Sequence, residues 1–131
     1  MTSQQMRLPQ VLLVEPQFVL RRTLGSVGAE LRLAEVTEAL SVEAAQAKLN
    51  AASFDALILG GIETTTLTEF VTQIRSGQAG CPADIRIVVM QSPAMSATRE
   101  TLEQIGADVV IERPFKVGQV FSAALTTPIE A

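Results

Sequence analysis

The sequence has no histidine and a single cysteine, and each of these absences excludes a kind of chemistry. Without histidine a Ser-His-Asp triad cannot form, and a zinc site is not expected from one thiol. One cysteine cannot close an intramolecular disulfide, which favours the reducing cytoplasm as the location of the chain. Cys81 lies beside Pro82 in a predicted loop, where no neighbouring group is expected to make its thiol reactive.

A surplus of positive charge is also missing. The 131 residues carry a formal net charge of −4, whereas a nucleic-acid binder needs a basic face that neutralises phosphates. The one adjacent basic pair, Arg21 and Arg22, fits a solvated helix face. No apolar stretch reaches membrane-spanning length, and residues 1–9 lack the apolar run of a signal peptide. We therefore expect no direct contact with nucleic acid or membrane.

The chain does contain enough apolar material for one core, because 47% of its residues are hydrophobic and only 18% are charged. We expect a flexible segment over 1–9, one folded domain over 10–125 and a tail over 126–131. Within the domain, apolar runs alternate with stretches of helical periodicity. Strands are predicted at 11–15, 32–36, 56–59, 85–91 and 109–112.

A helix is predicted after each strand from the spacing of its apolar residues. Gly25 and Gly28 weaken the first of these helices. The other expected landmarks are Ser41 as the N-cap of the second helix, Thr66 and Glu69 as a capping box for the third, Ser92-Pro93 at the start and Gly106 at the end of the fourth, and Val117, Val120, Phe121 and Ala124 inside the fifth.

Five strand–helix units in succession predict an α/β fold in which a parallel sheet lies between two layers of helices. Strands 1, 3 and 4 are the most uniformly apolar, so they are expected at the centre of the sheet. This gives strand order 2-1-3-4-5, the flavodoxin-like (βα)5 three-layer sandwich. Ligands bind such sheets beyond the carboxyl ends of the strands, where the order reverses between strands 1 and 3. The residues expected there are Glu15, Pro16, Gly60, Gly61, Glu63, Gln91, Ser92 and Arg113.

Four segments together resemble the receiver domain of two-component response regulators. They are "VLLVEPQFVLRRTL" (11–24), "FDALILGG" (54–61), "IRIVVMQS" (85–92) and "GADVVIERPF" (106–115). The resemblance covers roughly residues 10–125, and its specificity lies in the order and spacing of the segments. It implies a cytoplasmic, bacterial signalling protein of the two-component type.

The resemblance also implies a mechanism. Receiver domains accept a phosphoryl group from a histidine kinase on an aspartate at the end of strand 3. Carboxylates after strand 1 hold Mg²⁺, and a lysine before the last proline and a hydroxyl after strand 4 contact the phosphoryl oxygens. An aromatic residue on strand 5 turns inward and carries the signal. The peptide bond before Pro114 is expected to be cis, on the resemblance alone.

The sequence departs from this pattern at nearly every position. It has Gly60 at the phosphoacceptor, Glu15 and Pro16 at the acidic pair, Gln91 at the hydroxyl with Ser92 one residue later, Arg113 at the lysine and Val110 at the aromatic switch. Asp55 lies at the wrong end of strand 3 to replace the acceptor. Glu63 lies on the correct loop but has a longer, looser side chain. We expect no phosphorylation, no metal, no cofactor and no enzymatic activity.

Two readings of the remaining pocket residues stay open. Arg113 either pairs with Glu15 across the pocket, which the cost of an unpaired charge favours, or binds an anion. Gly60 and Gly61 either form a tight turn, which is favoured, or admit a phosphate, although no GxGxxG or P-loop pattern is present.

The function predicted from the sequence is that of a pseudo-receiver, which signals by protein–protein contact without phosphorylation. The partner would be a histidine kinase, an output domain or a second copy of the chain. The expected surface is the face of helix 4, strand 5 and helix 5, with Met95, Thr98, Arg99, Glu112 and Lys116; helix 1, with Arg21 and Arg22, is the second candidate. The alternatives are sensing of a nucleotide or another small anion through Arg113, and an active phosphoacceptor.

Overall fold

The computed structural model describes residues 7–91, 99–113 and 115–125, and within these ranges five strands alternate with five helices. The strands are β1 (Gln10–Val14), β2 (Glu35–Ala39), β3 (Ala56–Gly60), β4 (Arg86–Gln91) and β5 (Val109–Glu112). The helices are α1 (Phe18–Glu30), α2 (Val42–Ala51), α3 (Thr64–Arg75), α4 (Arg99–Ile105) and α5 (Val117–Leu125). None of the helices in these ranges is long and apolar enough to cross a membrane.

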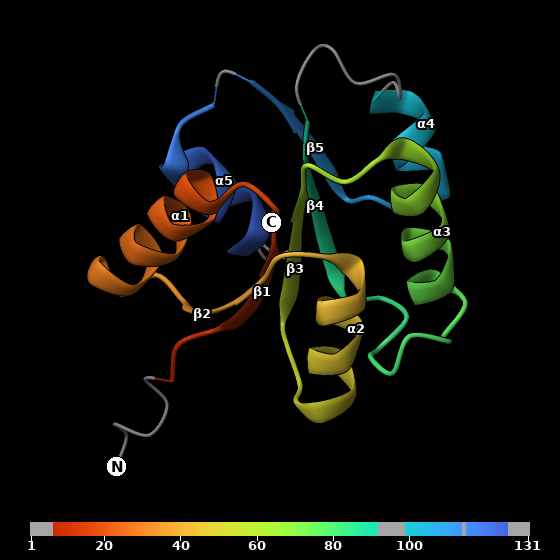
Figure 1. The fold of residues 1–131 in the computed structure, drawn as a ribbon, viewed down its shortest axis with the longest axis horizontal. Coiled ribbons are helices and arrows are strands. Elements are labelled where there is room, and N and C mark those ends of the chain that lie inside the picture. The colour runs from red at the N-terminus through yellow and green to blue at the C-terminus, as the bar shows by residue number, and fades with distance from the viewer. Residues whose placement is uncertain (1–6, 92–98, 114, 126–131) are drawn as a thin grey trace, which may run out of the picture.

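The strands form one parallel sheet in the order β2-β1-β3-β4-β5, which confirms the predicted fold and strand order (Figure 1). Every residue of β3 is buried, as a central strand of a parallel sheet requires. Leu57 of β3 is paired with Leu12 of β1 on one side and with Ile87 of β4 on the other. The uniform apolar runs therefore located the centre of the sheet correctly.

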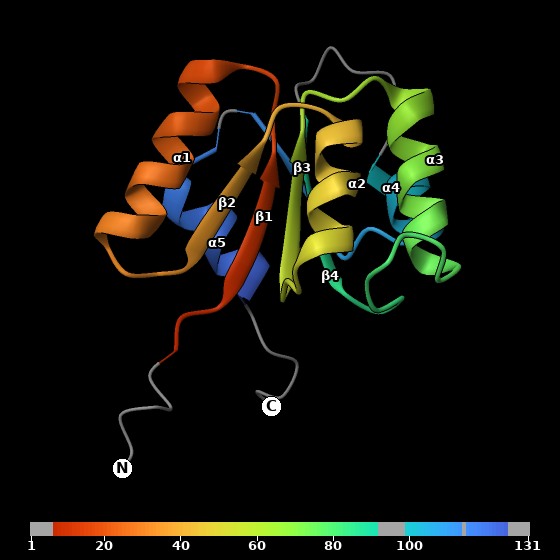
Figure 2. The same cartoon turned by 60° about the horizontal axis from the view of Figure 1, so that its bottom comes forward.

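The helices cover both faces of the sheet: α1 and α5 lie on one face, and α2, α3 and α4 on the other (Figures 1 and 2). Successive side chains of a strand point to opposite faces, so each central strand contributes to two cores. In β1, Leu12 and Val14 pack with α2 and α3, whereas Val11 and Leu13 pack with α1 and α5.

Helix α1 continues without a break to Glu30 although it contains Gly25 and Gly28. Both glycines allow side chains of neighbouring elements to pack closely against the helix. A Cβ atom at Gly28 would lie 2.7 Å from Cζ of Phe121, and one at Gly25 would lie 2.6 Å from a carboxylate oxygen of Glu38. The loss of helix propensity is therefore offset by the close approach of α1 to α5 and β2.

Strand β2 begins three residues later than predicted. The residues after α1 form a helix-terminating turn in which Leu33 N–H donates to the Gly28 carbonyl at 2.9 Å and Arg32 has φ +55°. The turn uses residues that were assigned to the strand, so the predicted range 32–36 is wrong. Glycine is the usual residue at such a left-handed position, and Arg32 gives no comparable signal.

Helix α3 begins two residues before the predicted cap at Thr66. Its N-cap is Glu63, whose carboxylate accepts hydrogen bonds from the backbone N–H groups of Thr65 and Thr66, each at 3.1 Å. The predicted capping box of Thr66 and Glu69 is therefore wrong. Helix α2 begins as predicted, since the Ser41 hydroxyl accepts from Ala44 N–H at 3.1 Å.

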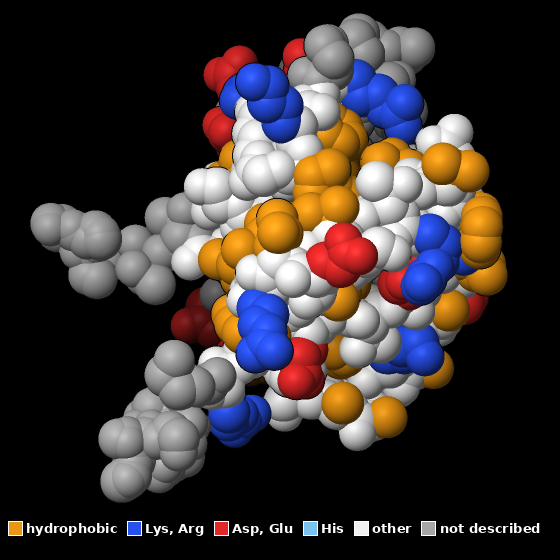
Figure 3. All heavy atoms as spheres, turned by 90° about the vertical axis from the view of Figure 1, so that its left-hand side faces the viewer, with side chains coloured by type: hydrophobic (Ala, Val, Ile, Leu, Met, Phe, Trp, Pro, Cys, Tyr) orange, Lys and Arg blue, Asp and Glu red, His pale blue; other side chains and the backbone are white. Residues whose placement is uncertain are grey.

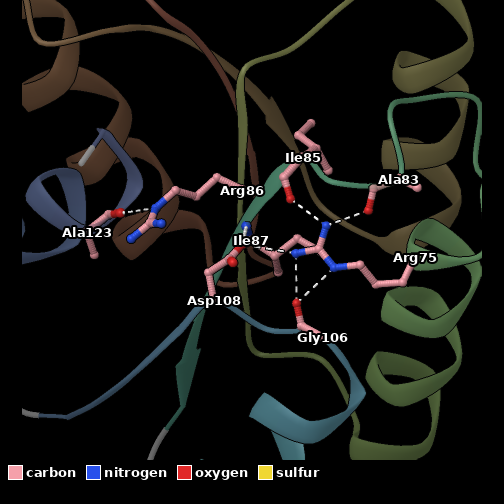
Figure 4. Close-up of polar contacts among 8 residues, drawn as sticks. All are labelled: Arg75, Ala83, Ile85, Arg86, Ile87, Gly106, Asp108 and Ala123. Carbon is pink, nitrogen blue, oxygen red and sulfur yellow. Dashed lines mark hydrogen bonds and ion pairs between the residues drawn. The ribbon is translucent and has the colours of Figure 1, made fainter. Parts of the chain in front are cut away.

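The guanidinium of Arg75, at the end of α3, joins the segments that lead into β4 and β5 (Figure 4). It donates to the carbonyls of Ala83 at 2.7 Å and Ile85 at 2.6 Å, and twice to that of Gly106, at 2.9 and 2.7 Å. It also pairs with Asp108 at 3.0 Å. One side chain thus fixes three loop carbonyls at the amino-terminal edge of the sheet.

The end of α4 follows the prediction, because Gly106 directly after it has φ +128°. The predicted start of this helix at Ser92-Pro93 lies outside the described residues. In α5, Val120, Phe121 and Ala124 are buried as predicted.

Candidate functional site

A cavity of about 360 Å³ lies at the carboxyl ends of the strands, beside the point where the strand order reverses. Its polar lining consists of Glu15, Gln17, Gln91 and Arg113, and its apolar lining of Pro16, Leu20, Met90 and Phe115, with Gly61 at its edge. Five of the residues predicted from the sequence therefore meet around one cavity: Glu15, Pro16, Gly61, Gln91 and Arg113.

The Glu15 carboxylate lies directly over the two glycines that end β3. One of its oxygens, Oε2, accepts a hydrogen bond from Gln17 N–H at 3.0 Å, and the side chain is almost fully buried. A Cβ atom at Gly60 would lie 2.5 Å from Glu15 Oε1, and one at Gly61 would lie 2.8 Å from Oε2. Real Cβ atoms do not approach that closely, so a side chain at either position requires the carboxylate to move.

The glycine pair thus has a steric explanation. A carboxylate carried by β1 fills the space that a side chain on Gly60 of β3 would enter. Gly61 also has φ +63°, a left-handed conformation that glycine adopts readily. The expected tight turn is present, and the Glu15 carboxylate lies against its two glycines.

Burial raises the pKa of the Glu15 carboxyl, and Gln17 N–H, Arg113 and Arg21 offset only part of that effect. A carboxyl with a raised folded-state pKa binds protons more readily in the folded state, so its ionisation costs stability as the pH rises above 4.5.

We expect Glu15→Gln to be more stable than the native chain near about pH 7, and this difference in stability to shrink on acidification. Urea unfolding of both proteins over a pH series measures the difference in the free energy of unfolding. A difference that grows on acidification would contradict a raised pKa of Glu15 in the folded state.

Arg113 does not form the predicted ion pair with Glu15. Its guanidinium lies at the exposed mouth of the cavity, 3.4 Å from Oε1 of Gln17 and 6.0 Å from the ring centre of Phe115. Its charge acts on Glu15 across the cavity without direct contact. The two side chains point into the same space, as predicted, but they start from opposite walls and leave room between them.

The remaining positions of the predicted pocket have separate roles. Gln91 is buried, and its amide lies 3.4 Å from the carboxylate of Glu112 on the neighbouring strand. Val110 is buried in the core beside α3 and α4, where it has no ring that could switch position. Ser92 and the peptide bond before Pro114 lie outside the described residues.

The other two candidate acids are engaged elsewhere. Asp55 accepts from Gln10 N–H at 2.7 Å at the opposite edge of the sheet. The Thr65 and Thr66 N–H groups lower the pKa of Glu63, whose carboxylate caps α3, and Glu63 does not line the cavity. Glu15 is therefore the one carboxylate among the residues that line it.

The basic pair on α1 is not the exposed patch that its sequence suggested. Arg21 is largely covered: it donates to the Glu15 carbonyl at 2.9 Å and pairs with Glu38 of β2 at 3.1 Å. Arg22 also pairs with Glu38 but remains half exposed. The partly buried carboxylate of Glu38 on an edge strand accounts for both arginines, and of the two only Arg22 is open to a partner.

The face that includes helix 4, strand 5 and helix 5 retains three of its predicted contact residues at the surface. Arg99, Glu112 and Lys116 are exposed, whereas Met95 and Thr98 lie outside the described residues. Sequence reasoning missed Phe18 and Val19, which expose 63% and 72% of their surface at the start of α1. Their position directly after the strand-1 turn was the available signal.

In the part of the chain that the structure describes, no group of three or more His, Cys, Asp or Glu residues could hold a metal ion. Burial raises the pKa of the Cys81 thiol, and Arg75 offsets only part of this effect.

The view of the α1 side shows basic and acidic side chains interspersed with apolar ones (Figure 3). This face therefore has no continuous basic surface.

No family model matches the chain, and no curated protein matches it either. Solved structures do. The Francisella response regulator 1452 receiver domain superposes with a TM-score of 0.72 at 12% identity, over 86% of this chain and 90% of that one. For the chemotaxis protein CheY4 of Vibrio cholerae these values are 0.71, 21%, 88% and 94%. For HP1043, an orphan response regulator of H. pylori, they are 0.71, 18%, 87% and 91%. The chain therefore has the fold of response-regulator receiver domains.

Proposed function

We propose that this chain is a pseudo-receiver of two-component signalling, which acts through protein contacts and not through phosphorylation. The observation that supports this most directly is the end of β3, where Gly60 offers no acceptor atom and the Glu15 carboxylate fills the space above it. A phosphoryl group would have to enter beside an existing negative charge and find a nucleophile on another residue.

A solved structure with the same fold offers a comparison that supports the proposal. A response regulator from Burkholderia pseudomallei, which superposes with a TM-score of 0.69 at 21% identity, contains a phosphorylated aspartic acid and a calcium ion. In the present chain the strand that should end in such an aspartate ends in Gly60, and Pro16 replaces one acid after β1. Both the acceptor and part of the cation site are lost together, which supports a loss of the chemistry as a whole.

The proposed contact surface is the α4–β5–α5 face, with Arg99, Glu112 and Lys116 exposed on it. Its partner in the cytoplasm would be a histidine kinase, an output domain or a second copy of the chain. The start of α1 is the second surface. Here the exposed side chains are the apolar Phe18 and Val19 together with Arg22, since Arg21 is occupied by Glu38.

Treatment of the native chain with acetyl phosphate or beryllofluoride plus Mg²⁺ tests the proposal. We expect no mass increase and no change in the amide NMR spectrum, because the cavity has one buried carboxylate and no aspartate. A receiver domain with an intact acceptor, treated in the same way, serves as the positive control. An adduct on any residue of the cavity would overturn the proposed function.

Small-ligand sensing is a second candidate function, and one observation favours it. Arg113 lines a cavity of about 360 Å³ and has no carboxylate within ion-pair distance among the described residues. This volume lies within the range of small-molecule sites. A ligand that contacts Arg113 and stabilises the fold on binding would make the cavity a sensor.

A further inference from the structure

The cavity contains two opposite charges that do not neutralise each other. On its floor, Oε1 of Glu15 receives no hydrogen bond from any described residue, and this oxygen is not fully closed off from the cavity. At its mouth, the Arg113 guanidinium lies 3.4 Å from Gln17 and 6.0 Å from the ring centre of Phe115, and it forms no ion pair with a carboxylate of the described residues. Glu15 and Arg113 can therefore each bind a further partner, and both line the same cavity.

These charges restrict what the cavity can bind well. Glu15 is largely desolvated, and a cation that reaches Oε1 would stabilise its ionised form. A simple anion at Arg113 would also be close to the negative charge of Glu15, and a simple cation at Glu15 would be close to the positive charge of Arg113. A molecule that carries both charges avoids both repulsions.

The cavity that contains the two charges also has an apolar lining. Leu20, Met90 and Phe115 are among the residues that line it. A short hydrocarbon spacer would bury its surface against these side chains, while ionic groups at its two ends face Glu15 and Arg113.

We propose that the cavity is a binding site for a small zwitterion of the amino-acid class, with its ammonium at Glu15 and its carboxylate at Arg113. The inference rests on the second candidate function, small-ligand sensing, and names the ligand class for it. It is independent of the docking surfaces, so binding and docking can be tested apart.

Thermal unfolding with a matched set of compounds tests this assignment. The set consists of 4-aminobutanoate, which carries both charges, with butanoate and butylamine, which carry one each. We expect 4-aminobutanoate or a homologue of different length to raise the Tm of the native chain by about 4 °C at roughly ten times its dissociation constant. Glycine, β-alanine and 5-aminopentanoate vary the spacing between the charges, and the best length reports the distance that the cavity spans. The singly charged compounds should give little or no shift.

Two variants assign the ends of the ligand. Glu15→Gln should abolish the preference for the zwitterion over butanoate, because it removes the partner of the ammonium. Arg113→Gln should abolish the preference over butylamine. Glu43→Gln removes a carboxylate from the same edge of the sheet but outside this cavity, and should leave the response unchanged.

The outcomes distinguish a wrong ligand class from a failure of the sensing function. If inorganic phosphate or a nucleotide stabilises the chain and no zwitterion does, ligand sensing stands and the ligand class is wrong. If no compound shifts the Tm, both the class and the sensing function fail. A zwitterion response that survives both cavity variants would place binding elsewhere and would also overturn the proposal.

Discussion

Replacing Arg75 with alanine is expected to destabilise the fold by about 2–4 kcal/mol. The substitution removes the donor to the carbonyls of Ala83, Ile85 and Gly106 and leaves Asp108 without its cation. Water can reach part of this region, because the Arg75 side chain is 22% exposed, and this limits the loss. Urea unfolding monitored by circular dichroism measures the change in the free energy of unfolding.

A neighbouring arginine provides the matched control. Arg86 lies in the same region and makes one side-chain hydrogen bond within the described residues, from Nε to the Ala123 carbonyl at 2.7 Å (Figure 4). Arg86→Ala should therefore cost clearly less than Arg75→Ala. Arg75→Lys keeps the charge but loses the fork that reaches several carbonyls at once, and we expect it to recover only part of the stability. Equal costs for the two alanine variants would contradict the proposed role of Arg75.

Placing an acid at the end of β3 by Gly60→Asp is expected to destabilise the chain by about 3 kcal/mol and to confer no phosphorylation. The new Cβ would lie 2.5 Å from Glu15 Oε1 and 2.6 Å from Cε of Met90, so both side chains must move. The variant would also place a second carboxylate next to that of Glu15. Chemical denaturation measures the first effect, and mass spectrometry after treatment with acetyl phosphate measures the second.

A double-mutant cycle identifies the cause. Glu15→Ala removes the carboxylate that occupies the space, so Gly60→Asp should cost about 1–3 kcal/mol less in that background than in the native chain. Gly118→Asp is a comparison substitution, because a Cβ atom at Gly118 would meet nothing within 4 Å. If the effects of the substitutions at residues 15 and 60 are additive, Glu15 does not fill the space that a side chain at residue 60 would enter.

The elements that the sequence predicted well are those in which one physical signal dominates. The apolar runs of β1 and β3 can be buried only at the centre of a sheet, and they were found there. Ser41 caps α2 and Gly106 ends α4 because their short or absent side chains suit those backbone positions.

The elements that it predicted poorly depend on residues in unusual roles. Arg32 adopts the left-handed turn that glycine normally takes, which displaced β2 by three residues. Glu63 caps α3 with a side chain one carbon longer than that of the favoured aspartate. Residue preferences describe frequent solutions, and in both places the tertiary structure selects a rarer one.

The candidate site was predicted in part of its membership but not in its arrangement: the lining residues Gln17, Leu20, Met90 and Phe115 were missed, and Glu63 does not line the cavity. Strand topology placed Glu15, Gln91 and Arg113 around one cavity. It gave no information on side-chain direction, and so neither the position of Glu15 over Gly60 nor the separation of Glu15 from Arg113 could be foreseen. Arg21 was misjudged for a similar reason, since it lies on α1 and its partner Glu38 lies on β2, 17 residues away in the chain.

The network around Arg75 has a consequence for which residues the chain can exchange. It lies where β4 and β5 begin, at the far edge of the sheet from the cavity. Substitutions at Glu15 and Arg113 therefore leave the hydrogen bonds of Arg75 in place. The residues that line the cavity can change one at a time while the free energy of unfolding stays above its threshold, so the same scaffold can accommodate new recognition chemistry.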